Sequence, residues 1–321
     1  MTTVLVTGIG GNVGQGILRN LRQDRPGFRL VGTDIHLVNG GSHLCDKTYV
    51  LPYAYERTYL DVVREVLRSE TVDLIIPSTD YETYYLSTLR AEIPIVACSP
   101  PETNEMFLDK FTTYQLFGRA GLPFAQTTVA SEYTGPSVGI VAKPREGRGS
   151  RGVIPNPSSV SRFGNDYVIQ PLLTGGEITT SFFIDRNRRL HGMITFRRML
   201  SAGTTILCEV VDDYNGQLLA IVSRLNECVT IRGSCNIQSI VTNDNEIVPF
   251  EVNGRISGTN SIRSHFGFKD VEYTVRDFLT GETLEPVVIK KGCAARILMD
   301  VIFPEQTLAT EKNRYVHFEL Q

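Results

Sequence analysis

The chain has 321 residues and a formal net charge of −3, with 41% hydrophobic and 21% charged residues. This length suits two or three domains, and the weak negative charge excludes a global positive field for nucleic acid or an anionic membrane surface. No apolar stretch approaches the roughly 20 residues of a membrane span, and the first residues lack a secretory-signal pattern, so a cytoplasmic protein is expected.

The six cysteines also favour a cytoplasmic protein. They stand at positions 45, 98, 208, 228, 235 and 293, without a C-x-x-C pair, and several lie in apolar runs. This spacing predicts reduced core residues, and neither a disulfide framework nor a zinc site.

The first hundred residues alternate between apolar strands and amphipathic helices. We expect strands at 3–8, 29–35, 72–78 and 93–99, and helices at 12–24, 56–70 and 80–92. This order is typical of a parallel sheet that carries helices on both faces.

The pattern changes after residue 98. Two prolines and an acidic cap within 98–110 predict the start of a helix that runs through 111–121 and ends at Gly121 before Pro123. Short strands with glycine turns are expected at 137–144, 147–153 and 166–173. Longer strands are expected at 178–185, 190–198, 206–211, 233–242, 246–255 and 293–303, with helices at 216–228 and 270–281.

Glycines at 8, 10, 11, 14 and 16 lie where the first strand turns into the first helix. Their spacing is similar to that of short-chain dehydrogenases, and Asp34 ends the second strand, where an acid that binds the ribose of NAD would sit. The alternative is that any open α/β sheet needs glycine at so sharp a turn. None of the 13 tyrosines has a lysine four residues later, as that dehydrogenase chemistry requires, so the NAD(P) hypothesis is disfavoured.

A basic glycine loop follows the strand that ends near Lys143. It contains Gly147, Gly149, Ser150 and Gly152, with arginines at 148 and 151. Glycines let backbone N–H groups approach phosphate oxygens, and the arginines add positive charge. The loop therefore predicts a phosphate-binding element, with a solvated hairpin as the alternative.

Two neighbouring strands further on carry a row of polar side chains. Residues two apart share a face of a strand, so Glu251, Asn253 and Arg255 project together. Asn236 and Gln238 do the same from the other strand. A carboxylate and two amide oxygens beside a basic glycine loop suit Mg²⁺, which prefers hard oxygen ligands. A polar solvent-facing edge is the alternative.

Together these segments resemble the ATP-grasp superfamily, and within it the carboxylate–amine ligases related to the large chain of carbamoyl-phosphate synthase. The resemblance covers nearly the whole chain. It rests on the opening glycine turn and on "IIPSTDYE", "LDKFTTYQLFGRAGLP", "GRGSRGV", "QPLLTGGE", "NIQ" and "FEVNGR". It implies ATP and Mg²⁺ as cofactors, with Mn²⁺ able to replace Mg²⁺.

The resemblance also implies the site residues. Lys110 and Lys143 would contact the ATP phosphates. The lid is implied at Gly147, Gly149 and Ser150, the adenine hinge at Gln170, Pro171 and Leu172 with Glu177 on the ribose, and the metal ligands at Gln238, Glu251 and Asn253. The family usually has glutamate where this chain has Gln170. Many members have aspartate where it has Gln238, although the carbamoyl-phosphate-synthase branch itself has glutamine there.

Two arginines complete the implied site. Arg255 would hold the acyl phosphate, because a guanidinium binds phosphate through two parallel hydrogen bonds. Arg197 and Arg198 are adjacent on a strand and so face opposite ways. The resemblance favours Arg198 as the one that points into the cleft.

The resemblance implies an α/β fold that becomes α+β in its C-terminal part. A Rossmann-like pre-ATP-grasp domain (1–98) would precede an ATP-grasp fold with a lid subdomain (99–172) and a catalytic subdomain (173–321). The implied enzyme phosphorylates a carboxylate with ATP and joins it to an amine or a thiol. A subunit like carbamoyl-phosphate synthase and a non-catalytic ATP-binding protein are the alternatives. The expected partners are small molecules, with no nucleic acid or membrane, and a homodimer is left open.

Overall fold

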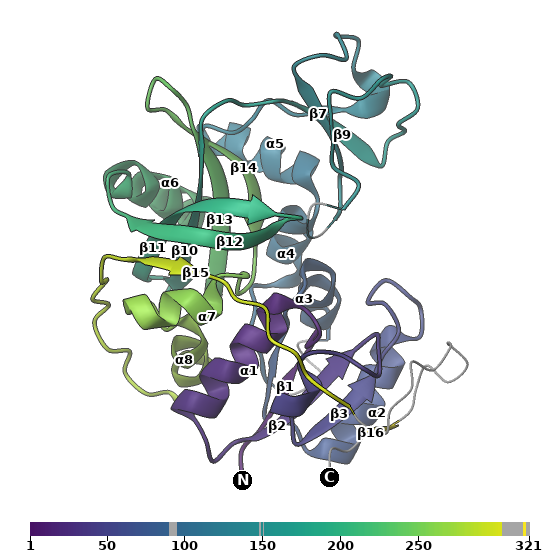
Figure 1. Cartoon of the computed structure of the whole chain (residues 1–321), viewed down its shortest axis with the longest axis vertical. Helices are drawn as coiled ribbons and strands as arrows, with labels where there is room; N and C mark the ends of the chain where they lie inside the picture. Colours follow the sequence, from purple (N-terminus) through teal and green to yellow (C-terminus); the bar gives the residue numbers. More distant parts are fainter. Residues whose placement is uncertain (90–94, 148, 150, 304–316, 319–321) are drawn as a thin grey trace.

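The computed structural model describes residues 1–89, 95–147, 149, 151–303 and 317–318. A parallel sheet near both chain ends lies below a large antiparallel sheet, and a small lobe with β7 and β9 lies at the upper right (Figure 1). The predicted fold class is confirmed, because a parallel N-terminal sheet is followed by antiparallel sheets.

Parallel pairing organises the N-terminal part. Its elements are β1 (Thr3–Val6), α1 (Asn12–Asp24), β2 (Arg29–Asp34), η1 (Ser42–Leu44), β3 (Lys47–Val50), α2 (Tyr59–Glu70), β4 (Leu74–Ile76), α3 (Asp80–Ser87) and β5 (Ile95–Val96). The order across the sheet is β16-β3-β2-β1-β4-β5, where β16 (His317–Phe318) runs antiparallel to β3. Successive β1 residues are fully buried on opposite faces, because helices cover both sides of the sheet.

The opening glycines make the turn from β1 into α1 compact. Gly8 has a φ of +58°, a conformation that favours glycine. A Cβ on Gly14 would lie 2.5 Å from the carbonyl oxygen of Gly8, so α1 can approach the turn only without a side chain there. Asp34 Oδ2 accepts the N–H of Gly10 at 2.7 Å. The glycine spacing thus has a structural cause of its own.

The middle of the chain forms two helices and a small sheet. Its elements are α4 (Pro101–Leu108), α5 (Lys110–Ala120), β6 (Thr128–Val129), η2 (Ala130–Glu132), β7 (Ile140–Pro144), β8 (Ile154–Pro155) and β9 (Tyr167–Pro171), with sheet order β6-β9-β7-β8. Asp109 has an extended backbone, and its side chain accepts the N–H of Phe111. This cap starts a second helix at Lys110, so the segment between the two prolines and Gly121 forms two helices.

A six-stranded antiparallel sheet forms the largest layer. The elements here are β10 (Gly176–Ile184), β11 (Leu190–Ser201), β12 (Thr204–Val211), α6 (Asn215–Cys228), β13 (Gly233–Val241), β14 (Ile247–Asn253), α7 (Asn260–Arg263), η3 (Ser264–Phe266), α8 (Asp270–Thr274), the π-helix η4 (Val275–Thr280) and β15 (Cys293–Ala295). The strand order is β14-β13-β10-β11-β12-β15. One face of this sheet packs against α5 and α6 and forms a hydrophobic core with them. On the opposite face, Phe183 and Phe196 pack in a second cluster with Ile17 of α1. This second core fixes the N-terminal turn opposite the ends of β13 and β14.

Other differences from the predicted elements lie at edges. The strand predicted at 293–303 exists only over Cys293–Ala295, where it pairs with β12. The described residues of 147–153 form no strand. Sequence patterns also miss β3, whose first residue, Lys47, is charged. In the described ranges, no helix has both the length and the apolar character needed to cross a membrane.

Arg263 and Asp270 form an ion pair inside the C-terminal part. Their side chains are 0% and 1% exposed, and Arg263 Nε donates to Asp270 Oδ1 at 3.0 Å. Arg263→Met leaves the Asp270 carboxylate buried without its cation, so the free energy of unfolding should fall by about 3–5 kcal/mol in urea titrations. Arg224→Met breaks an exposed pair with Glu227 and should hardly move the urea midpoint. Equally small effects in both variants would contradict a structural role for the buried pair.

Candidate functional site

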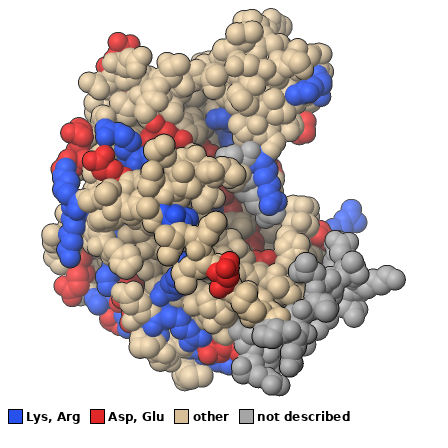
Figure 2. Space-filling view, in the orientation of Figure 1, with Lys and Arg blue, Asp and Glu red and all other residues tan. Residues whose placement is uncertain are grey.

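A cavity of about 740 Å³ separates the N-terminal part from the antiparallel sheet. Its walls are the β1–α1 turn, the ends of β2 and β4, the β11–β12 hairpin, and the facing side chains of β13 and β14. In the space-filling view a notch divides the lobe that carries β7 and β9 from the N-terminal part (Figure 2). The cavity therefore lies at the carboxyl ends of the parallel strands, where open α/β sheets bind ligands.

The predicted metal ligands lie together on β13 and β14. Gln238 pairs with Glu251 across the two strands, and Gln238 Nε2 donates to Asn253 Oδ1 at 3.2 Å. Asn253 Nδ2 donates to Glu251 Oε1 at 3.2 Å. Burial alone would raise the pKa of Glu251, but the charges of Lys110 and Lys143 and the bond from Asn253 hold that pKa below its usual range. The site thus offers one ionised carboxylate and two amide groups, a donor set that suits Mg²⁺.

Two lysines flank this carboxylate. Lys110 is buried, and Lys143 Nζ donates to Gln170 Oε1 at 2.7 Å and lies 4.5 Å from the ring centre of Phe250. Within the described ranges, neither ammonium group has a carboxylate oxygen within 4.0 Å. Burial lowers the pKa of Lys143 to about 8; Glu251 opposes this shift and Lys110 adds to it. Two enclosed ammonium groups that have no carboxylate oxygen within ion-pair distance fit the phosphates of ATP.

Arg198 joins two other predicted residues. Its guanidinium donates to Glu177 Oε1 at 2.5 Å and to Gln238 Oε1 at 2.6 Å, and it lines the cavity. The adjacent Arg197 is 48% exposed and lies 3.5 Å from a Glu209 oxygen. The two arginines therefore face opposite ways, with Arg198 on the cavity side.

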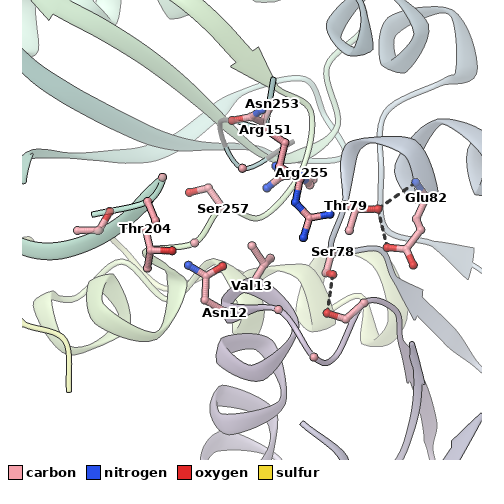
Figure 3. Close-up of a pocket in the computed structure, with 18 of the residues that line it drawn as sticks. Asn12, Val13, Ser78, Thr79, Glu82, Arg151, Thr204, Asn253, Arg255 and Ser257 are labelled. Carbon is pink, nitrogen blue, oxygen red and sulfur yellow. Dashed lines mark hydrogen bonds between the residues drawn. The ribbon is translucent and has the colours of Figure 1, made fainter. Parts of the chain in front are cut away.

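Arg255 reaches from the end of β14 toward Ser78 and Thr79 of the N-terminal part (Figure 3). Its guanidinium donates to Asp80 Oδ2 at 2.6 Å, and Asp80 Oδ1 accepts Asn253 Nδ2 at 3.3 Å. The sequence interpretation did not include Asp80. Its position at the start of α3, just after β4, is the signal that could have found it, because ligand sites gather where parallel strands end.

The lid and hinge residues lie around the lysines. Gly147 is near Lys110, since an added Cβ there would lie 3.9 Å from Lys110 Nζ. Gly149 is exposed with a φ of +58°, and it lines the cavity beside Arg151. Ser150 lies outside the described residues.

The hinge residues differ in exposure. Gln170 is buried and bonds Lys143 and Thr127. Pro171 and Leu172 are exposed, and the N–H of Leu172 donates to the carbonyl oxygen of Gly139 at 2.8 Å. The backbone N–H of Leu172 is therefore already hydrogen-bonded within the protein.

Two family models match separate parts of the sequence. Residues 107–259 match the family model for an ATP-grasp domain, and residues 4–98 match that for a PylC-like N-terminal domain. Among curated proteins, no significant match to the sequence exists.

Solved structures show the same fold at low sequence identity. The N5-carboxyaminoimidazole synthetase from Staphylococcus aureus, complexed with ADP, is 12% identical with a TM-score of 0.76, covering 92% of this chain and 82% of that one. The biotin carboxylase domain dimer of the Hydrogenobacter thermophilus 2-oxoglutarate carboxylase, in complex with MgADP, ADP and bicarbonate, is 15% identical with a TM-score of 0.69, over 91% and 73%. The two family matches together place the chain in the ATP-grasp superfamily of ligases, with a PylC-like N-terminal domain.

Proposed function

We propose that the protein is a Mg²⁺- and ATP-dependent ligase that activates a carboxylate as an acyl phosphate and joins it to an amine or another nucleophile. The observation that carries this proposal is the pair of lysines, Lys110 and Lys143, that flank the Glu251 carboxylate without ion-pair partners among the described residues. The cavity that begins at Glu251 extends to the N-terminal turn and offers space for a second substrate.

In this proposal the lysines bind the ATP phosphates and the glycine loop with Gly147, Gly149 and Ser150 closes over them. Gln170, Pro171 and Leu172 form the adenine hinge, and Glu177 binds the ribose. Glu251, Gln238 and Asn253 would hold Mg²⁺, which when bound neutralises charge on the terminal phosphates. We also propose residues 1–98, 99–172 and 173–321 as the three units.

The proposed reaction has two steps. A carboxylate oxygen of the substrate attacks the γ-phosphorus of ATP, the bond to the bridging oxygen breaks, and ADP leaves. The nucleophile then attacks the acyl carbon, phosphate leaves, and the nucleophile loses a proton. Arg255 would stabilise the transferred phosphoryl group through paired hydrogen bonds, and Arg198 would lie against the substrate. Closure of the loop would keep water from the acyl phosphate.

One observation favours a second candidate, an ATP-binding protein without ligase activity. The guanidinium of Arg198 donates to the side-chain amide oxygen of Gln238 at 2.6 Å. This oxygen of a proposed metal ligand is therefore already bonded within the protein. A subunit like the large chain of carbamoyl-phosphate synthase is a narrower form of the first proposal. It would act on bicarbonate, the anion named beside MgADP in the Hydrogenobacter structure. We propose a cytoplasmic enzyme with small-molecule partners, and a homodimer is compatible with it.

A substrate screen separates these candidates. ADP release is followed across a matrix of carboxylates, including bicarbonate, and amines or thiols, and products are identified by mass spectrometry. The ligase proposal expects one pair that yields ADP, phosphate and a condensed product in equal amounts. Formation of AMP and pyrophosphate, or tight ATP binding with no turnover in any mixture, would contradict it.

The pKa of Lys143 predicts how nucleotide affinity depends on pH. The protonated ammonium binds phosphate and has a pKa of about 8 in the free protein. Affinity for Mg·ADP should therefore fall as pH rises through 8, by up to about tenfold per pH unit, and binding near pH 8 should take up a proton. Calorimetry in two buffers of different ionisation enthalpy measures both effects.

A matched variant tests the assignment to Lys143. Lys143→Arg keeps a positive charge above pH 8 and should flatten the pH profile, even if its absolute affinity is lower. An unchanged pH profile in this variant would show that another group titrates.

A further inference from the structure

Asn236 lies in the wall of the cavity and is only 1% exposed. Its Oδ1 accepts three hydroxyl groups, from Thr179 at 2.9 Å, Ser181 at 3.0 Å and Ser257 at 3.1 Å. Among the described residues, all the hydrogen bonds of the Asn236 side chain are therefore made by its amide oxygen.

A buried arginine fixes the direction of the bond from Ser257. Arg263 donates to Ser257 Oγ at 2.7 Å, and its own charge is neutralised by Asp270. A guanidinium can only donate, so the Ser257 oxygen accepts from it, and the single proton of Ser257 goes to Asn236 Oδ1 at 3.1 Å or to Ser181 Oγ at 3.4 Å. The shorter of these two distances favours an Asn236 amide whose oxygen faces Ser257 and whose nitrogen faces away from it.

The amide nitrogen of Asn236 has no acceptor among the described residues. This nitrogen is not one of the buried atoms without a partner, so it reaches the cavity, where a ligand atom can accept its hydrogen bond. Asn236 pairs with Asn253, two residues along the strands from the pair of Gln238 and Glu251 and on the side of Ser257. Asn236 therefore lies opposite one proposed metal ligand, Asn253, and further toward Ser257 than the other two.

The neighbouring wall also favours a negative ligand. Asn12 and Val13 begin α1, line the cavity, and have no acidic residue in their helical turn. A Cβ on Gly258 would lie 2.9 Å from Asn12 Nδ2, so this helix start adjoins the residue after Ser257. The first N–H groups of a helix attract anions.

We propose that Asn236 Nδ2 binds an oxyanion of the non-nucleotide substrate, a carboxylate or the acyl phosphate formed from it. Ser257 and Arg263 are positioning residues, because they hold the amide with its N–H groups toward the cavity. The identity of the oxyanion rests on the proposed ligase function, whereas the orientation of the amide does not.

The test follows the side-chain amide of Asn236 by NMR in protein labelled with ¹⁵N-asparagine. Its signal is assigned by its loss in Asn236→Asp. Acetate, bicarbonate and inorganic phosphate are titrated as separate probes, each with and without Mg·ADP. Asn104 is the internal reference, since its Nδ2 already donates to the carbonyl oxygen of Ser99 at 2.8 Å.

At least one probe should shift the Asn236 signal saturably and leave Asn104 unmoved. Ser257→Ala should weaken that probe about tenfold by freeing the amide to rotate, and Ser257→Thr, which keeps the hydroxyl, should restore most of the affinity. Ser239→Ala removes another buried hydroxyl of β13, one without a hydrogen-bond partner in the part of the chain that the structure describes, and should change nothing.

Two results would overturn the proposal: no probe moves the Asn236 signal, or Ser257→Ala binds the probe as well as the unchanged protein. Failure of the ligase proposal looks different. The substrate screen would then yield no condensed product, while the titrations without nucleotide still report on Asn236.

Discussion

Glu251→Gln should lower ATP turnover by roughly a thousandfold while the protein stays folded. Glu251 is the only carboxylate among the three proposed metal ligands, and the charges of Lys110 and Lys143 help to hold it ionised. Glutamine has nearly the same shape but removes the negative charge, so metal affinity falls and the two lysines lose a nearby negative charge. Steady-state ADP release with the substrates from the screen measures the loss, and circular dichroism checks the fold.

Glu209→Gln is the matched control. Glu209 carries the same change from acid to amide, but it is 60% exposed and pairs with Arg197 on the outer side of the sheet. It should keep full turnover. Normal turnover in Glu251→Gln as well would show that the metal assignment is wrong.

Arg255→Ala should lower kcat by about 100- to 1000-fold and change Mg·ADP affinity only a few-fold. Arg255 reaches toward the N-terminal part, where its guanidinium donates to Asp80. Arg255→Lys keeps the charge but loses the two-pronged bond to a phosphate, so it should lose about tenfold or more in kcat. Steady-state kinetics and calorimetry on the same preparations separate turnover from nucleotide binding.

The ion pair with Asp80 complicates the alanine variant, because the Asp80 carboxylate is then left without its cation. Asp80→Asn combined with Arg255→Ala removes that charge, and the kcat loss should remain if it comes from chemistry. Loss of Mg·ADP binding in either Arg255 variant would place this residue in the nucleotide site or in the folding core. Full activity in both would make it a structural ion-pair residue.

Local patterns predict most of this fold. Alternating apolar strands and amphipathic helices indicate the parallel sheet, because each residue's face follows from its spacing along one element. The spacing of Glu251, Asn253 and Arg255 likewise predicts that their side chains share one face of a strand. Such patterns miss β3, where the charged Lys47 opens a short strand.

Such local patterns do not predict contacts between distant segments of the chain. Asp80 meets Arg255 across 175 positions, and the pairing depends on how two layers pack. Arg198 of β11 donates to Gln238 of β13 across the intervening strand β10. The spacing of residues along a single strand does not predict this contact. The direction of the Asn236 amide likewise depends on Arg263, whose contact with Ser257 needs the turn after β14. The roles proposed for these residues remain predictions.

The most direct test of the central claim, that this chain binds Mg·ATP in the site around Glu251, is calorimetric titration of the intact protein with Mg·ATP and, separately, with NADH and NADPH. The account predicts saturable, one-to-one binding of Mg·ATP that weakens strongly in Lys110→Ala and Lys143→Ala, and no binding of either dinucleotide. Tight binding of NADH or NADPH at the opening glycine turn, with no heat from Mg·ATP, would contradict it.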